Sequence, residues 1–370
     1  MSHEATKSQA PDRDPAGLSV ADRKEILRRV YALEPGLPVP LLVQPFAKWY
    51  ATADVIADPA ADIALQAQRN RDQEAVGDFT VPHLKTGAGL GAIAASFTGG
   101  CNYNDKSDAW IEPIIGVHPE RVYDLQLPDP RASGINPLIY ERLAIYGTAG
   151  AQLGYPIQPC NIASPLTTAS YIWGYTEFLA AMVDHPKEMH YLLELVTQAT
   201  IDAVRGQMAA IQDLWCLSHE DWYMPTEMGI RVSDDVLAVI SPRHYREFGV
   251  RYNNRLSAEF GGIVVHSCGN IGHQAPTILE NKGLRAIDLA LPHNDPAVLA
   301  SSLAGRVALT MRYWIQDWEN RPMPDLETYT DQAIAALGTR GILLQMQAPS
   351  LDDCVALHAR LRQKSWNHAA

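Results

Sequence analysis

The sequence lacks several features that would place it in a specialised class of protein. It has no run of about 18 or more apolar residues, the length that a helix needs to span a bilayer. Residues 1–19 include no apolar segment of the kind that a secretory signal requires. Lysine and arginine number 30 against 42 acidic residues, giving a formal net charge of −12. Because phosphate-binding surfaces need clustered lysine and arginine, and no such cluster appears, nucleic acid is not an expected partner. The missing apolar run makes a membrane an unexpected partner as well.

Cysteine is also scarce: there are five cysteines, an odd number, and they are widely spaced. This pattern does not predict a disulfide framework, so we expect reduced thiols and a cytoplasmic location. Most of these thiols are expected to be small buried apolar groups. Cys268 differs because it lies two residues after His266, at the end of the apolar run "GGIVV".

The chain has enough apolar residues, 47% of 370, to bury a large core. After about residue 160, apolar strand-like segments alternate with helical patterns and short connections, which is typical of a parallel sheet covered by helices. The sequence therefore predicts the α/β class, as a single-domain (β/α)8 TIM barrel with an N-terminal helical extension. Residues 1–19 are expected to form a disordered tail, and residues 20–370 the barrel.

The predicted elements can be given by their ranges. The helices are expected at 20–33, 175–183, 184–211, 241–261, 275–283, 295–305, 325–338 and 350–363. The strands are expected at 213–222, 262–269, 284–291, 306–312 and 341–348, and residues 159–174 are expected to form a strand and a loop. Ser19 and Ser350 are the expected N-caps of the first and last helices, each with an aspartate three residues on. "GAGLGA" (87–92) comes close to a dinucleotide fingerprint, but its spacing and surroundings do not fit one.

Polar residues end most of these apolar runs. In α/β barrels the working residues lie at the C-terminal ends of the strands and in the loops that follow. The candidates at such positions are Glu220, Asp221, His266, Cys268, Asp288, Arg312, Gln345 and Gln347.

His266 and Cys268 alternate along one predicted strand, so both side chains point to the same face. Thiolate and imidazole are preferred ligands of zinc, and a catalytic zinc site leaves one position open. The pair therefore indicates zinc, with Asp288 and Gln347 as candidates to complete the ligand set. The alternative is a buried cysteine beside a hydrogen-bonded histidine.

Three stretches resemble the uroporphyrinogen decarboxylase superfamily: "SPLTTASYIWGYTEFLAAMVDHPKEMHYLLELVTQATIDAV", "ISPRHYREFGVRYNNRL" and "HSCGN". The resemblance covers residues 20–365 and is closest to the zinc-dependent methyltransferase branch that serves corrinoid proteins and coenzyme M. It implies a barrel with a funnel at its mouth and a metal on His266 and Cys268. It also implies a third ligand, a cysteine on the last strand.

The chain departs from the sequence patterns of this superfamily in three respects. Gln347 or Gln345 stands where the branch has its third cysteine, and Cys354 lies in the following helix. The arginine-rich N-terminal motif of true uroporphyrinogen decarboxylases is absent, which makes porphyrinogen decarboxylation less favoured. There is also no Asp-x-His-x-x-Gly motif, so a corrinoid would come on a separate protein or as a free cofactor.

The remaining candidates have a functional and a structural interpretation each. Glu220 or Asp221 could be a general acid or base, or else a helix cap or ion-pair partner. Arg312 could bind a substrate anion through bidentate hydrogen bonds, or it could form an ion pair with Asp288. Candidate substrate-binding residues, which could equally be turn or loop anchors, are Cys101, Asn102, Tyr103, Trp222, Tyr223 and Trp314.

Together these observations predict a methyl or alkyl transferase. Its substrate would be a small methylated or methoxylated molecule, and transfer would use a zinc-bound thiol or a corrinoid acceptor. Two alternatives stay open: a metal-free decarboxylase or lyase that uses Arg312 and a strand-end acid, and a non-catalytic tetrapyrrole or corrinoid carrier. The sequence leaves the oligomeric state open, with a homodimer as one option.

Overall fold

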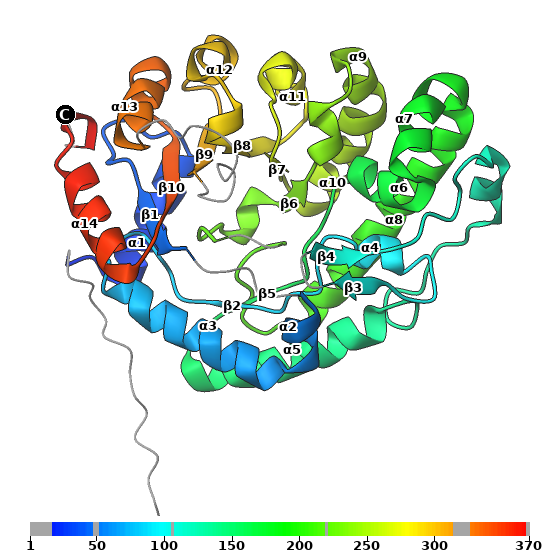
Figure 1. The fold of residues 1–370 in the computed structure, drawn as a ribbon, viewed down its shortest axis with the longest axis horizontal. Helices are drawn as coiled ribbons and strands as arrows, with labels where there is room; N and C mark the ends of the chain where they lie inside the picture. The colour runs from blue at the N-terminus through cyan, green and yellow to red at the C-terminus, as the bar shows by residue number, and fades with distance from the viewer. Residues whose placement is uncertain (1–16, 47–51, 105–106, 219–220, 314–325, 368–370) are drawn as a thin grey trace, which may run out of the picture.

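Six parallel strands form the centre of the fold. The computed structural model describes residues 17–46, 52–104, 107–218, 221–313 and 326–367. The strands of the main sheet lie in the order β1-β10-β9-β8-β7-β6, and every neighbouring pair is parallel. Helices cover the outer face of this sheet, as Figure 1 shows.

The elements have the following bounds. The strands are β1 (Leu41–Pro45), β2 (Leu84–Lys85), β3 (Asn102–Asn104), β4 (Ser107–Trp110), β5 (Ile157–Gln158), β6 (Ile230–Ser233), β7 (Ile263–Ser267), β8 (Leu284–Ala290), β9 (Ala308–Tyr313) and β10 (Ile342–Ala348). The α-helices are α1 (Val20–Tyr31), α2 (Thr52–Ala57), α3 (Pro59–Glu74), α4 (Ala92–Ala95), α5 (Asn136–Leu153), α6 (Pro165–Trp173), α7 (Tyr175–Asp184), α8 (Pro186–Ala210), α9 (Pro242–His244), α10 (Arg251–Phe260), α11 (Ala275–Ile278), α12 (Pro296–Leu303), α13 (Leu326–Leu337) and α14 (Leu351–Arg362). The short 3₁₀ helices are η1 (Pro119–Asp124), η2 (Thr226–Met228), η3 (Asp235–Ala238), η5 (Gly272–Gln274), η6 (Leu291–His293) and η8 (Ser365–Asn367), and η4 (Tyr245–Val250) is a π-helix.

Shorter contacts continue the main sheet on both sides. Beyond β6, Leu217 forms a parallel bridge to Ile230, and Leu214 forms one to Ile157 of β5. β5 in turn pairs with β2, and on the far side the Phe79 amide donates to the Leu41 carbonyl of β1. The molecule is therefore an α/β barrel of the TIM type, as the sequence predicts, although part of its wall consists of isolated bridges.

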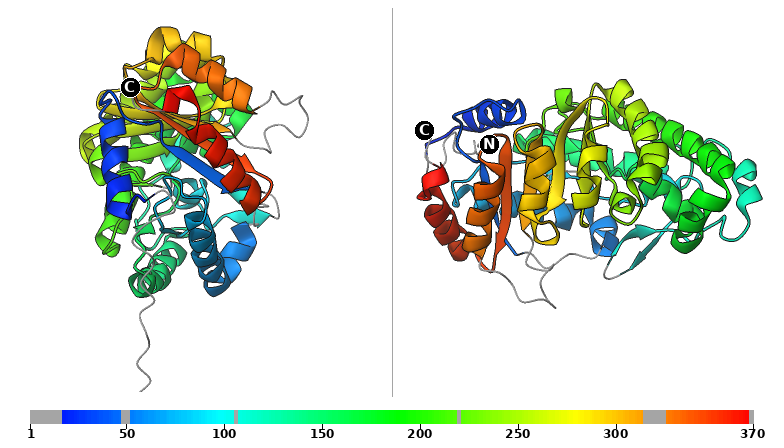
Figure 2. Two further views of the ribbon diagram at one scale, coloured as in Figure 1. Left: turned by 90° about the vertical axis from the view of Figure 1, so that its left-hand side faces the viewer. Right: turned by 90° about the horizontal axis from the view of Figure 1, so that it is seen from above.

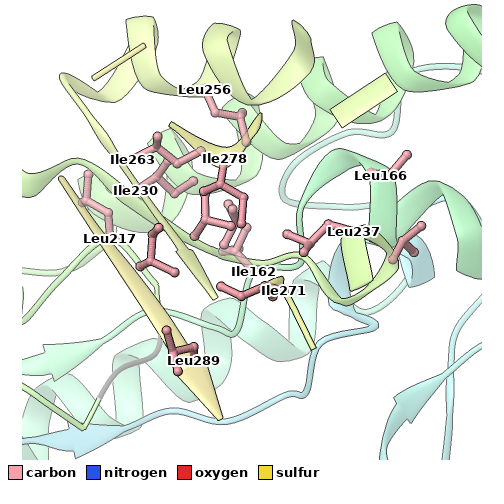
Figure 3. Packing of buried hydrophobic residues seen from close by; sticks show 14 of the residues in the cluster. Ile162, Leu166, Leu217, Ile230, Leu237, Leu256, Ile263, Ile271, Ile278 and Leu289 are labelled. Atoms are coloured by element: carbon pink, nitrogen blue, oxygen red, sulfur yellow. The ribbon is translucent and has the colours of Figure 1, made fainter. Parts of the chain in front are cut away.

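Alternation along the strands sorts side chains between two cores. In β7, Ile263 and Val265 belong to the large core between the sheet and the outer helices. Figure 3 shows Ile263 packing there toward Leu256 of α10 and Ile278 of α11. Val264 instead points inward, and His266 shares its side of the strand. Apolar residues thus fill the inner layer near the start of β7, and a polar residue occupies it near the end.

Helix α1 closes the end of the barrel at which the strands begin. Leu27 and Val30 pack with inward-facing Val264 and Ala308 in the second core, and the left view of Figure 2 shows α1 on one flank of the strands. Ser19 caps α1 through the predicted capping box with Asp22. The opposite end, where the strands finish, is the end at which a barrel carries its site.

Two predicted segments were wrong. Residues 159–174, expected to be strand and loop, contain helix α6, because Ser164 accepts a hydrogen bond from the Thr167 amide and so caps a helix that begins with Pro165. Residues 213–222, expected to be a strand, form only isolated bridges at Leu214 and Leu217 in their described part.

The predicted helix over 241–261 is interrupted. The π-helix η4 separates α9 from α10, and such bulges are frequent at functional sites. Gly249 lies under the Tyr245 ring, where a Cβ would collide with the ring carbons. Across the described ranges, no helix is both long and apolar enough to serve as a membrane span.

Candidate active site

His266 and Cys268 lie together where β7 ends. His266 is buried, Cys268 is exposed, and the imidazole Nε2 is 3.1 Å from the Cys268 Sγ. His266 is the fourth residue of β7, and Cys268 is the first residue after the strand ends at Ser267. A buried nitrogen donor and an accessible sulfur are therefore adjacent at the open end of the barrel.

Asp288 holds the histidine from the neighbouring strand. β7 and β8 pair so that His266 stands opposite Asp288, and the imidazole Nδ1 is 2.9 Å from the Asp288 Oδ2. This contact directs the other ring nitrogen, Nε2, toward Cys268. Orientation of a ligand histidine by a carboxylate is a recurring feature of metal sites.

Two arginines neutralise Asp288. Arg231 Nη2 lies 2.7 Å from its Oδ2, and Arg312 Nε lies 2.5 Å from its Oδ1. Burial by itself raises the pKa of Asp288, but Arg312, His266 and Arg231 outweigh burial and hold that pKa well below its usual range. Asp288 is fully buried, and both of its oxygens have cationic partners. Its contact with the imidazole Nδ1 therefore orients His266.

The same contacts act on the histidine. Burial lowers the pKa of His266, but the Asp288 carboxylate more than compensates, and the pKa rises to about 9. The imidazole is therefore protonated at neutral pH in the metal-free protein. A metal would have to displace that proton from Nε2.

Asp235 is a third donor that sequence reasoning missed. It begins η3, two residues after the end of β6, and its Oδ1 accepts a hydrogen bond from the Cys268 amide at 2.9 Å. Ligand atoms of Asp235, His266 and Cys268 all lie within 4.8 Å of one another. These three residues could hold a metal ion. The only sequence signal for Asp235 was the pair Asp234-Asp235 after the short run "GIRVS".

A second polar group surrounds Asp221 on the same side of the barrel. The Lys85 Nζ forms an ion pair with Asp221 Oδ1, and Gln345 Nε2 donates to Asp221 Oδ2 at 2.7 Å. Arg312 Nη1 lies 3.4 Å from the same oxygen, so Arg312 connects Asp221 to Asp288. Burial raises the pKa of Asp221, but Lys85 and then Arg312 hold it far below its usual range. Lys85, which sequence reasoning also missed, has 40% of its side chain exposed, whereas Asp221 has 10%.

The other predicted site residues are dispersed. Gln347 is buried on β10, Cys101 is partly buried before β3, and Asn102 begins β3 with its side chain exposed. The backbone of Tyr103 belongs to β3, but its side chain lies outside the described structure, as do Glu220 and Trp314 entirely.

Trp222 and Tyr223 do not lie where the sequence analysis expects them. Both rings are buried in the core that α1 closes, and Arg28 of α1 donates to the Tyr223 hydroxyl at 2.6 Å. Their predicted role of stacking on a substrate does not agree with this placement, because apolar packing at the closed end of the barrel covers the rings.

A protein-family sequence model matches more than half of the chain. The sequence model described as Uroporphyrinogen decarboxylase (URO-D) matches residues 100–309, a range that includes Asp235, His266, Cys268 and Asp288. No curated protein sequence matches the chain.

Two solved structures are similar to the molecule. A methyltransferase from Methanosarcina mazei superposes with a TM-score of 0.64 at 16% identity, over 91% of this chain and 97% of that one. At this identity the likeness shows the fold alone. A carboxyl transferase domain of Rhizobium etli pyruvate carboxylase has a TM-score of 0.32 at 12% identity, over 94% of this chain and 56% of that one, which is too low a score to assign a shared fold.

Proposed function

Because the chain belongs to the uroporphyrinogen decarboxylase family, we propose that it is a methyl or alkyl transferase of that family. The substrate would be a small methylated or methoxylated molecule, and the acceptor a thiol or a corrinoid. The observation that carries the proposal is the His266–Cys268 pair at the open end of the barrel, with Nε2 aimed at Sγ by Asp288. The fold that it shares with the Methanosarcina mazei methyltransferase supports the same class.

Zinc fits the donors that are present. One thiolate, one imidazole and one carboxylate carry two negative charges, which balance a divalent cation, and all three are accepted zinc ligands. When bound, zinc would make a coordinated thiol lose its proton at neutral pH. A corrinoid would come on a separate protein or as a free cofactor.

The protein's own residues have distinct tasks in this proposal. Asp288 fixes the orientation of His266, and Arg231 and Arg312 keep Asp288 ionised in its buried position. Lys85 and Asp221 lie on the same side of the barrel and would contact the polar end of a substrate. The transfer forms a bond from the acceptor to the methyl carbon, while the electron pair of the broken bond leaves with the donor atom.

The test begins with metal analysis of protein purified without chelator. We expect about one zinc per chain, and less than a tenth of that in His266→Ala and in Cys268→Ala. Cys354→Ala is the matched control, since it removes a buried thiol of α14 and leaves the pair intact. Metal-free wild-type protein that cannot be reloaded with zinc would refute the proposal. Methyl transfer to cob(I)alamin, followed by visible absorption, and to a thiol, followed by loss of free thiol, then measures turnover and identifies the acceptor.

A metal-free lyase is the second candidate, supported by the Asp221 group. Lys85 and Arg312 could hold a substrate carboxylate near Asp221. However, the low pKa of Asp221 keeps it ionised, which makes it a poor general acid. Carbon dioxide release by chelated protein would favour this candidate. Tight cobalamin binding without turnover would favour the non-catalytic carrier.

A further inference from the structure

The third metal ligand is the unusual part of this site. The chain has Gln347 on β10 where the resemblance leads us to expect a cysteine. We infer that Asp235, from the other side of β7, supplies the third ligand together with His266 and Cys268. This inference rests on the proposed metal-dependent function and names a ligand set that differs from the expected one.

Strand register places Asp235 beside Cys268. β6 and β7 are parallel neighbours, and Ser233 stands opposite His266. Asp235 and Cys268 each follow two residues later, so they leave the sheet side by side. The Asp235 amide donates to the Thr167 hydroxyl at 3.1 Å, which fixes the start of η3. The carboxylate is therefore held at the end of β7 by local backbone structure.

The hydrogen bonds of Asp235 leave it able to bind a cation. Oδ1 accepts from the Cys268 amide, and among the residues that the structure describes no donor is recorded for Oδ2. The Oδ1 bond fixes the plane of the carboxylate next to the thiol. A carboxylate held in this way loses little further side-chain entropy when a metal binds.

Other candidates for the third ligand are weaker. Both oxygens of Asp288 are engaged by buried cations, and releasing one of them would break a buried ion pair with Arg231 or Arg312. Gln347 offers an amide oxygen, which is neutral and a weak ligand for zinc. A divalent ion beside a single thiolate needs a second anion, and within the described ranges Asp235 is the carboxylate that lies within 4.8 Å of the other two donor atoms.

The ligand set has a measurable signature. With Asp235 as ligand, the metal has one sulfur donor, whereas a site with two cysteines has two. Cobalt(II) reports this difference, because each thiolate bound to it adds intensity to a near-ultraviolet charge-transfer band. Replacing a thiolate by a carboxylate also makes the ligand set harder.

The experiment titrates cobalt(II) chloride into the metal-free full chain and records absorption, with zinc competition for affinity. Wild type should show a band of single-thiolate intensity. Asp235→Asn should weaken cobalt and zinc binding by roughly 10-fold or more. Asn retains a side-chain oxygen that can accept the hydrogen bond from the Cys268 amide, so a folding defect is not expected. Asp235→Cys should bind cobalt with about twice the band intensity.

Gln347→Ala is the matched control and should leave both affinities within about 2-fold of wild type. The inference is overturned if wild type binds metal but Asp235→Asn binds it equally well, or if Gln347→Ala loses it. In either case the proposed function survives, because the metal is still bound. Absence of metal binding by wild type would overturn both. Circular dichroism of each variant separates a folding defect from a lost ligand, and Asp235→Glu replaces any variant that does not fold.

Discussion

Asp288 shows how a single buried residue can define the chemistry of its neighbours. It contacts Arg231, Arg312 and His266, and it is fully buried. Removing one member of such a group leaves buried charges uncompensated, which typically costs about 3–5 kcal/mol. Asp288 is therefore expected to matter both for stability and for metal affinity.

Asp288→Asn should lower the free energy of unfolding by about 3–5 kcal/mol, because the buried Arg231 and Arg312 both lose their ion pair with this carboxylate. It should also weaken zinc binding by about 10–100-fold, because the imidazole is no longer held. Urea unfolding and competition with a chromophoric chelator measure the two effects. Asp124→Asn, at an exposed position, is the control and should change neither. Unchanged zinc affinity in the Asp288 variant would show that His266 does not depend on this carboxylate.

Asp221 predicts a dependence of stability on pH. The pKa of this carboxyl in the folded protein lies far below its ordinary value of 3.8, since Lys85 and Arg312 outweigh burial. In acid the unfolded chain therefore takes up a proton more readily than the folded one. Asp221 thus stabilises the fold above about pH 4, and this stabilisation is lost as the pH falls.

The measurement is urea unfolding of wild type and Asp221→Asn at pH 7, 5, 4 and 3. The difference in unfolding free energy should be largest at pH 7 and 5, and should shrink at pH 4 and 3. A difference that does not change with pH would mean that the Asp221 ion pairs contribute nothing to stability. The exposed Asp124→Asn variant again provides the baseline.

At the scale of elements, the turn into β6 positions the Asp235 segment. Gly229 has a φ of +82°, and a Cβ there would collide with the backbone of Gly262, just before β7. Gly229→Ala should therefore lower the free energy of unfolding by about 1–3 kcal/mol, and the same substitution should also weaken metal binding. Gly147→Ala, in the middle of α5 with no atom near the added Cβ, should be neutral or stabilise by about 0.5–1 kcal/mol. Thermal unfolding and cobalt titration of both variants test this, and a Gly229 variant of normal stability would contradict it.

Elements with strong local signals are the ones that the sequence predicts. The caps Ser19 and Ser350 are confirmed, because a serine side chain bonds to a backbone amide three residues away and needs no distant partner. The strand ending in His266 is confirmed for the same local reason: a buried apolar run stops in polar groups.

Elements whose form depends on distant contacts are missed. β6 has only four residues, so the sequence around Asp235 has no clear period. Its candidate role becomes visible only in the structure, where its carboxylate accepts a hydrogen bond from the Cys268 amide. Lys85 likewise belongs to a two-residue strand, and it contacts Asp221, which lies 136 positions away in the sequence. Within the π-helix the Tyr245 ring covers Gly249, a contact that apolar periodicity cannot reveal.

At the scale of the whole molecule, the barrel separates stability from chemistry along its axis. The closed end holds apolar residues from α1 and the inner layer, including Leu27, Val264 and Ala308. The open end holds His266 and Cys268 with their charged neighbours. Substitutions at the closed end should therefore change the unfolding free energy without altering the properties of the metal site.

Leu27→Ala tests this separation. Leu27 is fully buried, so its truncation should lower the free energy of unfolding by about 2–5 kcal/mol through lost burial and the cavity left behind. Zinc affinity, measured well below the unfolding temperature, should stay within about 2-fold of wild type, because additive behaviour is expected for distant sites that share no partner. If zinc affinity falls as steeply as in Asp288→Asn, the two ends of the barrel are coupled. The packing of α1 would then be part of what positions His266.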